Sequence, residues 1–379
     1  MQEQNGASTM KYTSQDVESL IDEMQASVTQ ANRDNAEGVA IYGAGFVGTW
    51  AAQYLKSIGA TITHFIDRDP KKEGSSINGI KVVLPTDPAV SANKTTYIAA
   101  RHAVKAVKKA MAGNNFNLIS FEGYYVAMNY ERFAVVRDNY LEDSKSVETY
   151  NALLLAMLTG SLESCRAVMV KDMYFALPEF SGTFDEIYLD AGAFVGDTVE
   201  QFIWRNMGTF RHLYAFEPGA KQFAAIQHRM ERLSREWALS NDSISIVKAG
   251  LGAVNSRMNF TYVDDSPLRH GLTTEDQENV GKDSSSIEVH SMDSFLQGKP
   301  VTFIKADVEG MEMDLLRGAR KTILKHKPKM ALCAYHYPSD LFEIAEHVRE
   351  LVPEYKFSLR QHVPIFGDFV LYCYCSDET

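Results

Sequence analysis

The stretch Ile187-Tyr-Leu-Asp-Ala-Gly-Ala-Phe-Val-Gly-Asp-Thr198 decides the fold of the second half of the chain. Its first residues are apolar and predict a buried strand, whereas its last residues begin a helix. Between them lies Asp190-x-Gly192-x-x-x-Gly196, an acid at the carboxyl end of the strand followed by a glycine turn. This order predicts a doubly wound α/β domain, in which ligands bind beyond the carboxyl ends of the strands.

A second acid, Glu217, ends the next predicted strand, 212–217. Its two carboxylate oxygens can accept hydrogen bonds from both hydroxyls of a ribose. The Gly192-x-x-x-Gly196 spacing has no need to admit a pyrophosphate, so the layout favours S-adenosylmethionine (SAM), which has none. We expect Asp190 to orient the cationic end of SAM. The predicted cofactor site is completed by Gly192, Gly196, Thr198 and Ala249. The alternative is a plain α/β domain whose acids cap helices.

Strands and helices alternate from residue 187 to the end of the chain. We predict strands at 243–249, 258–263, 301–307 and 329–336, and helices at 198–207, 220–233, 293–296, 312–325 and 339–351. The last two strands, 356–362 and 368–375, are separated by a short loop and must therefore be antiparallel. A mostly parallel sheet closed by such a hairpin fits the methyltransferase version of the doubly wound fold. Residues 264–286 are predicted to form a long polar loop of the kind that covers or binds a ligand.

Charged residues crowd the end of strand 301–307 and the helix after it. Glu309 and Glu312 have an ordinary explanation, because acids near a helix start complement its dipole. Helix-dipole stabilisation does not explain Lys305 and Asp307, and a charge on a buried strand is costly unless it is paired or functional. We predict that Lys305, Asp307 and His336, which ends the neighbouring strand, are catalytic.

Two of these residues are candidates for the base that removes a proton from the methyl acceptor. His336 is the better base on its ordinary pKa, although a structural histidine bonded to backbone is an equal alternative, and Asp307 is the other candidate. A divalent cation held by Asp307, Glu309 and His336 would be chemically reasonable. The sequence does not require one, so we predict no metal site.

Four segments of the second half resemble the FkbM family of SAM-dependent methyltransferases, namely Asp190-Ala-Gly-Ala-Phe-Val-Gly-Asp197, Ala215-Phe-Glu-Pro218, Ile304-Lys-Ala-Asp-Val-Glu-Gly-Met-Glu312 and Leu315-Leu-Arg-Gly-Ala319. Lys327-Pro328 and Tyr335-His336 also fit, so the resemblance spans residues 180–375. It implies a class I methyltransferase fold and methyl transfer to oxygen, often a hydroxyl of a sugar, glycan, polyketide or other secondary metabolite. The family commonly has asparagine and isoleucine where this chain has Phe194 and Val195, so a more apolar cleft is expected beside the cofactor.

The first half contains a second glycine turn, Gly43-x-Gly45-x-x-Gly48, between a strand that begins at Val39 and helix 49–58. The strand after it, 61–67, ends at Asp67, which completes the pattern typical of a dinucleotide site. The alternative is that these glycines only pack a helix against a strand. This part predicts a small Rossmann-like domain with a nucleotide site at Gly43, Gly45, Gly48 and Asp67. It resembles small Rossmann-like units fused to enzymes of glycan biosynthesis.

The length of 379 residues predicts more than one domain. We expect a tail with an amphipathic helix over 1–35, a Rossmann-like domain over 36–135, a helical connector or cover over 136–180 and a methyltransferase domain over 181–379. The apolar spacing predicts the amphipathic helix at 13–33, which is compatible with packing on its own domain or in a homo-oligomer. Other expected elements are strand 95–100, a hairpin near 80–84, and helices 104–111 and 139–160.

The composition of the chain limits where the protein is expected to reside and what it is expected to bind. A net charge of −11 argues against a nucleic-acid surface. No apolar run is long enough to cross a membrane and no signal peptide is visible, so we expect a cytoplasmic protein without a membrane partner. The four cysteines show no zinc-type spacing and are expected to be buried thiols.

Three functional hypotheses follow. The first is a SAM-dependent O-methyltransferase acting on a small molecule or glycan. The second is a nicotinamide-dependent oxidoreductase or a nucleotide-binding module that uses Gly43–Asp67, although no residue there suggests a hydride-transfer acid or base. The third is a non-enzymatic sensor or partner protein with a vestigial cleft.

Overall fold

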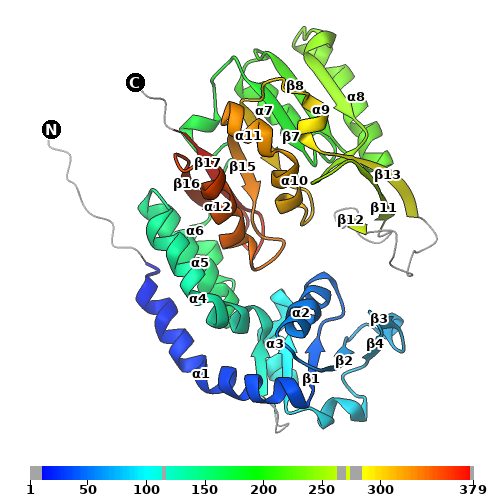
Figure 1. Cartoon of the computed structure of the whole chain (residues 1–379), viewed down its shortest axis with the longest axis vertical. Coiled ribbons are helices and arrows are strands. Elements are labelled where there is room, and N and C mark those ends of the chain that lie inside the picture. The colour runs from blue at the N-terminus through cyan, green and yellow to red at the C-terminus, as the bar shows by residue number, and fades with distance from the viewer. Residues whose placement is uncertain (1–10, 113–116, 263–269, 274–283, 376–379) are drawn as a thin grey trace, which may run out of the picture. The chain divides into compact units, whose positions relative to one another are not determined.

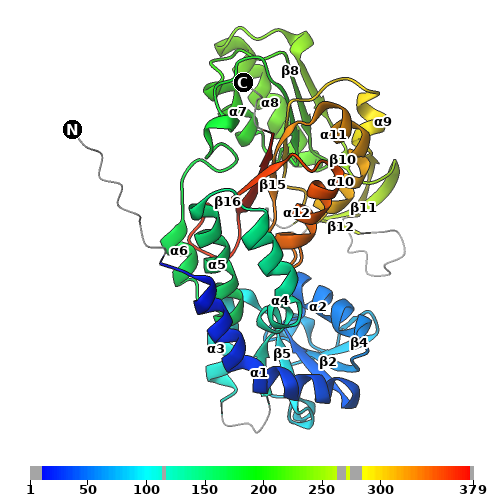
Figure 2. The same cartoon turned by 60° about the vertical axis from the view of Figure 1, so that its left-hand side comes forward.

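The computed structural model describes residues 11–112, 117–262, 270–273 and 284–375 (Figures 1 and 2). The chain forms two compact units. The first comprises Met1–Met169 and Leu359–Gly367, and the second comprises Val170–Ser358 and Asp368–Thr379. Within the described ranges, no helix combines the length and the apolar character that crossing a membrane requires.

A six-stranded sheet in the order β3-β4-β2-β1-β5-β6 forms the centre of the first unit. Its strands are β1 (Val39–Tyr42), β2 (Ile62–Ile66), β3 (Ser76–Ile77), β4 (Ile80–Val83), β5 (Thr95–Ile98) and β6 (Asn117–Ser120). Neighbouring strands are parallel except in the β3-β4 hairpin. This is the Rossmann-like fold that the glycine turn predicted. The sequence pattern did not predict β6, because that strand is short and has polar residues at both ends.

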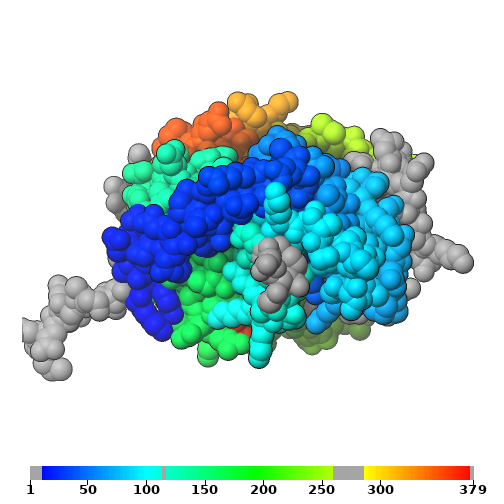
Figure 3. Space-filling view, turned by 90° about the horizontal axis from the view of Figure 1, so that it is seen from below, coloured from blue at the N-terminus to red at the C-terminus, as the bar shows by residue number. Residues whose placement is uncertain are grey.

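Six helices accompany this sheet, namely α1 (Ser14–Glu37), α2 (Phe46–Ser57), α3 (Val104–Ala110), α4 (Phe121–Asn139), α5 (Ser144–Thr159) and α6 (Glu163–Val168). The predicted amphipathic helix α1 begins after Thr13, which forms a capping box with Asp16. It packs on α4 and α5 of its own unit (Figure 3). Figures 1 and 2 show α4 and α5 side by side. The helix expected over 139–160 begins only at Ser144, and α4 was not predicted because aromatic residues mask its periodicity.

A seven-stranded sheet in the order β16-β17-β15-β14-β7-β8-β9 forms the centre of the second unit. Its strands are β7 (Ile187–Ala191), β8 (His212–Phe216), β9 (Ile244–Val247), β14 (Phe303–Ala306), β15 (Lys329–Cys333), β16 (Lys356–Gln361) and β17 (Phe369–Tyr374). The strands β15, β14, β7, β8 and β9 are parallel to one another, whereas β17 is antiparallel to β15. The predicted mostly parallel sheet is confirmed, and the two strands predicted as its closing hairpin, β16 and β17, lie next to each other at its edge.

The helices of this unit are α7 (Asp197–Arg205), α8 (Ala220–Glu236), α9 (Met292–Leu296), α10 (Glu312–Gly318), α11 (Arg320–His326) and α12 (Asp340–Leu351). The single helix predicted over 312–325 is wrong, because the chain leaves the helical region at Ala319 (φ −103°, ψ 5°). The break follows Gly318, which packs so closely on Gly252 that an added Cβ would lie 2.0 Å from the carbonyl oxygen of Gly252.

A second, four-stranded sheet has the order β10-β13-β11-β12. It contains β10 (Gly250–Leu251), β11 (Ser256–Tyr262), β12 (His270–Thr273) and β13 (Ser284–His290). The unbroken loop predicted over 264–286 is therefore wrong, since β12 and the start of β13 fall inside it. The pairing of β11 with both strands stabilises them despite their polar sequences. Residues 263–269 and 274–283 of that predicted loop lie outside the described residues.

The apolar core of the second unit lies beneath the carboxyl ends of its strands. Tyr188 of β7 stacks on Phe202 of α7 with their ring centroids 4.2 Å apart, and Phe303 of β14 meets Tyr188 edge to face at 4.9 Å. These side chains are almost completely buried. The core therefore fixes β7, α7 and β14 relative to one another, and with them the turns that leave these strands.

The two glycines at the start of α2 have different structural roles, which substitution can separate. An added Cβ at Gly48 would lie 1.8 Å from the carbonyl oxygen of Gly43, whereas one at Gly45 meets nothing within 4 Å. We expect Gly48→Ala to lower the free energy of unfolding by about 1–3 kcal/mol, as overpacking does. Gly45→Ala should change it by less than about 1 kcal/mol. Urea unfolding followed by circular dichroism measures both, and equal losses would contradict the packing role of Gly48.

Candidate active site

A cavity of about 450 Å³ lies at the carboxyl ends of β7, β8 and β14 in the second unit. Its lining comes from the turns after these strands, from the segment before β7 and from the start of β17. The residues that line it are Met173, Tyr174, Gly192, Phe194, Asp197, Thr198, Gln201, Phe216, Glu217, Pro218, Ala249, Gly250, Leu251, Lys305, Asp307, Val308, Glu309, Tyr335 and Asp368. This is the edge at which doubly wound sheets bind ligands.

The glycine turn after β7 brings backbone against backbone. Gly192 has a φ of 78°, and a Cβ added to it would lie 1.8 Å from the carbonyl oxygen of Asp307. Only glycine fits there, because both the dihedral angle and the contact exclude a side chain. Gly196 adopts φ 79° as the residue before α7. The turn therefore places the start of α7 and the end of β14 on the same cavity.

Glu217 follows β8 and is buried, with 6% of its surface exposed. One carboxylate oxygen accepts a hydrogen bond from the backbone N–H of Gly219 at 2.7 Å, and the other accepts one from Phe194 at 3.0 Å. Burial raises the pKa of Glu217 to about 7, although these two hydrogen bonds act in the opposite direction. The carboxylate is thus held rigidly, and each oxygen keeps a further lone pair for a ligand.

Lys305 and Asp190 form an ion pair in the interior of the sheet. They lie opposite each other on β14 and β7, with Nζ of Lys305 2.9 Å from Oδ1 of Asp190. The ammonium also donates to the carbonyl oxygen of Gly192 at 2.7 Å. Burial disfavours the charged lysine, but the charges of Asp190 and Asp307 outweigh it and raise the pKa of Lys305. Lys305 is therefore a permanent cation, and Asp190 contacts it beneath the cavity lining.

Asp307 is held by two tyrosine hydroxyls. Tyr174 donates to Oδ2 at 2.9 Å and Tyr335 donates to Oδ1 at 3.2 Å. Burial favours the neutral acid, but the charges of Lys305 and His336 and the hydrogen bond from Tyr174 together lower the pKa of Asp307. Asp307 is thus an oriented carboxylate on the cavity wall.

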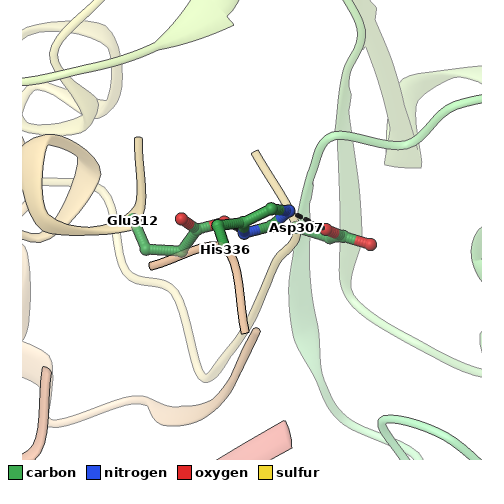
Figure 4. A group of neighbouring side chains, drawn as sticks. All are labelled: Asp307, Glu312 and His336. Atoms are coloured by element: carbon green, nitrogen blue, oxygen red, sulfur yellow. Dashed lines mark ion pairs between the residues drawn. The ribbon is translucent and has the colours of Figure 1, made fainter. Parts of the chain in front are cut away.

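His336 lies between carboxylates on both sides of its ring (Figure 4). Its Nδ1 is 3.1 Å from Oε1 of Glu312, and its Nε2 is 3.6 Å from Oδ1 of Asp307 and 3.7 Å from Oε2 of Glu309. Burial alone would lower the pKa of this imidazole, but the charges of Glu312, Asp307 and Glu309 raise it to about 10. In the absence of a competing cation, His336 therefore carries a proton at neutral pH.

Two more acids face the cavity from strained backbone. Glu309 has a φ of 55° and Asp368 a φ of 46°, values that side chains other than glycine rarely adopt. The Glu309 side chain is about half exposed. Burial of the carboxyl group and the nearby charges of Asp307 and Glu312 raise its pKa to about 7 against the opposing charge of His336. These residues add negative charge to the same end of the cavity as Asp307.

The cavity brings together most of the residues predicted from sequence. Gly192, Thr198, Glu217, Ala249, Lys305 and Asp307 line it, whereas Asp190, Gly196 and His336 lie behind its wall. Sequence reasoning missed Asp368, which precedes β17. Because β17 is antiparallel to β15, its first residue lies at the edge where the parallel strands end, and this signal was available. No comparable signal pointed to Met173 or Tyr174.

The glycine turn that was predicted to bind a nucleotide lies in the first unit. Its acid, Asp67, already has hydrogen-bond partners within the protein. Asp67 accepts hydrogen bonds from the backbone N–H groups of Ala44 and Asp69, both at 3.0 Å, and from Lys72 at 2.8 Å. Burial opposes ionisation, but Lys72 and these N–H groups lower the pKa of Asp67. Gly43 and Gly48 meet neighbouring backbone, as the packing alternative predicted, whereas the position beside Gly45 is open.

Residues 190–359 match the family model of the methyltransferase FkbM domain. Almost all of the matched range lies in the second unit. The matched range contains the glycine turn, Glu217 and the cluster from Lys305 to His336. The match is to the same methyltransferase family that the sequence motifs resemble.

One solved structure has a similar fold over nearly the whole chain. The FkbM methyltransferase from Methylobacillus flagellatus shares 20% sequence identity at a TM-score of 0.57, covering 95% of this chain and 98% of that one. An rRNA methylase from Streptococcus thermophilus shares 14% identity over 50% of this chain and 87% of that one, with a TM-score of 0.32. No curated protein matches the sequence.

The buried charges of Lys305 and Asp190 are expected to be costly to the fold when either one is left without the other. Lys305→Met leaves a buried carboxylate without its partner and should lower the free energy of unfolding by about 3–5 kcal/mol. The double variant Lys305→Met/Asp190→Leu removes both charges and should recover most of that loss. Denaturant unfolding of Lys305→Met, Asp190→Leu and the double variant measures this coupling. Additive losses would contradict it.

Proposed function

We propose that the second unit is a SAM-dependent methyltransferase that methylates a hydroxyl of a sugar, glycan or secondary metabolite. The observation that carries the proposal is that one cavity joins the glycine turn after β7, the Glu217 carboxylate after β8 and the acids that follow β14. The first two features suit a nucleoside cofactor with a charged end. The third suits an acceptor that must lose a proton.

The chemistry of the cavity lining supports SAM as the cofactor. The volume of the whole cavity, about 450 Å³, lies in the range of roughly 300–1,000 Å³ that small-molecule sites occupy. Phe194, Phe216 and Leu251 offer apolar surface to an adenine, and Glu217 offers acceptor oxygens to ribose hydroxyls. Asp197 and Thr198, at the start of α7, line the same end. The Phe194 that departs from the common family pattern belongs to this apolar surface.

The acceptor end is formed by Asp307, Glu309, Tyr335 and Asp368. SAM supplies a methyl group on a sulfonium, which is already activated for transfer. The task left to the protein is to hold the acceptor oxygen about 3–3.5 Å from that carbon, in line with the bond that breaks. Asp307 suits this positioning role, because its two tyrosine partners fix its carboxylate.

A hydroxyl acceptor also loses a proton, and the site offers carboxylates to receive it. His336 is already protonated at neutral pH in the unliganded protein, so its proposed role is to hold the surrounding acids in place. Lys305 is committed to Asp190 and is proposed to fix the strand ends. Among the predicted catalytic residues, Asp307 is the one that faces the acceptor end directly, and it shares that face with Glu309 and Asp368.

The nucleotide predicted for the first unit has weaker support than SAM. A ribose that bound Asp67 would have to displace the ammonium of Lys72. The open position beside Gly45, at the start of α2, is the observation that favours a ligand there. We therefore place the chemistry in the second unit and retain the first unit only as a candidate nucleotide-binding module.

Replacing Glu217 tests the proposal. Glu217→Ala removes the carboxylate acceptor for the ribose hydroxyls, and each hydrogen bond to a charged group contributes about 1.5–3 kcal/mol. Calorimetric titration with SAM and with its demethylated product should show binding by the wild type and affinity about 100-fold lower or worse for the variant. Glu231→Ala, which removes an exposed acid on α8, is the control and should bind as the wild type does. A wild-type protein that binds neither compound would refute the proposed function.

A further inference from the structure

The acceptor end contains a histidine set among three carboxylates. Asp307, Glu312 and His336 each offer a donor atom within 4.8 Å of the other two (Figure 4). The Glu309 carboxylate reaches the same imidazole from the cavity side. We propose that His336, Asp307 and Glu309 bind a divalent transition-metal ion at this end of the cavity, with Glu312 orienting the histidine.

The two ring nitrogens of His336 face different partners, and this fixes the side on which an ion fits. Nδ1 is at hydrogen-bond distance, 3.1 Å, from Oε1 of Glu312. Nε2 is 3.6 Å from Asp307 and 3.7 Å from Glu309, which is too far for good hydrogen bonds. Two ligands that each lie about 2.1 Å from one ion are separated by roughly 3.0–3.7 Å at ordinary bond angles. Each of these two carboxylates therefore lies at the distance from Nε2 that two ligands of one ion have.

Glu312 has the position of a residue that orients a metal-binding histidine. Such histidines usually donate the hydrogen of the other ring nitrogen to a carboxylate or a carbonyl. Oε1 of Glu312 faces Nδ1 and is held in place by the backbone N–H of Val308 at 2.9 Å. An ion that displaces the proton of Nε2 to solvent would then meet a lone pair directed toward Asp307 and Glu309.

The cluster contains more negative charge than the described protein groups neutralise. Three carboxylates surround one imidazole, and the neighbouring ammonium of Lys305 is already paired with Asp190. Glu312 is 1% exposed, and its Oε2 has no hydrogen-bond partner among the described residues. A buried carboxylate oxygen in this state is costly. A cation bound at Nε2 would not contact this oxygen, but its charge would stabilise the buried carboxylate across the imidazole ring.

The remaining contacts suit a metal site that opens onto the cavity. Asp307 keeps its hydrogen bonds from Tyr174 and Tyr335, which set the direction of its carboxylate. The half-exposed Glu309 lines the cavity and gives an ion a route from solvent. One imidazole and two carboxylates favour Mn²⁺ or Zn²⁺ over Ca²⁺, because nitrogen is a poor ligand for hard cations.

Such an ion would also limit the class of acceptor that can bind. This part of the inference rests on the proposed function. A cation with open positions binds a substrate best when two adjacent oxygens reach it, so a vicinal diol or an α-hydroxy acid is the expected class of acceptor. The ion lowers the pKa of a bound hydroxyl. Asp368 lines the same end and lies outside the ligand set, so it can take the proton when the carbon–sulfur bond breaks and the carbon–oxygen bond forms.

Calorimetric titration of chelator-treated protein with Mn²⁺, Zn²⁺ and Ca²⁺ tests the inference. The wild type should bind one Mn²⁺ or Zn²⁺ more tightly than Ca²⁺. His336→Gln and Glu309→Gln should each weaken binding by about tenfold or more, and Glu312→Gln by about 10–100-fold. Asp314→Asn is the matched control, because it removes an exposed acid on the same helix as Glu312 and should leave the affinity within about twofold. Glu309→Gln changes a half-exposed side chain, so the test does not depend on whether His336→Gln folds.

A wild type that binds neither Mn²⁺ nor Zn²⁺ at about 1 mM would overturn the inference. So would equal affinity in the wild type and in both the His336 and Glu309 variants, which would indicate adventitious binding. The demethylated product of SAM is titrated into the same samples. Product binding without metal binding would reject the metal site alone, whereas metal binding without product binding would reject the proposed function alone.

Discussion

The ion pair between Lys305 and Asp190 is the constraint on which the second unit depends. It joins the two central strands β14 and β7 at opposite positions of the sheet, where almost no solvent reaches. Because Lys305 also donates to the carbonyl oxygen of Gly192, the same ammonium fixes the glycine turn. A buried pair of this kind adds little net stability, but loss of either partner is costly. The strand ends that form the cavity are therefore held in one arrangement.

The charged groups that line the cavity are mostly acidic. Its lining contains five carboxylates, those of Asp197, Glu217, Asp307, Glu309 and Asp368, and among the described residues Lys305 is the only lysine or arginine in it. Since that lysine is neutralised by Asp190 behind the wall, the interior favours cations. A positively charged cofactor at one end and a metal cation at the other would both be attracted by these carboxylates. The proposed function and the proposed metal site thus rest on one electrostatic feature.

Sequence patterns predicted the features that depend on local chemistry. Gly192, Glu217 and Asp307 could be placed on one edge because each follows a strand of a parallel sheet. The ionisation of His336 could not be predicted, since it depends on Glu309 and Glu312, which approach the ring from another strand end. The strands β6 and β12 were missed for a related reason. Their sequences predict strands only weakly, and pairing with the neighbouring strands β5 and β11 stabilises them.

Hydrogen–deuterium exchange with saturating demethylated SAM product tests the central claim most directly, because it reports which of the two glycine turns binds the cofactor. We predict slower amide exchange over 192–198 and 217–219, where the N–H groups of Phe194 and Gly219 already bond to Glu217. Exchange over 43–67 in the first unit should not change. Protection confined to 43–67, or none in either turn, would contradict the account.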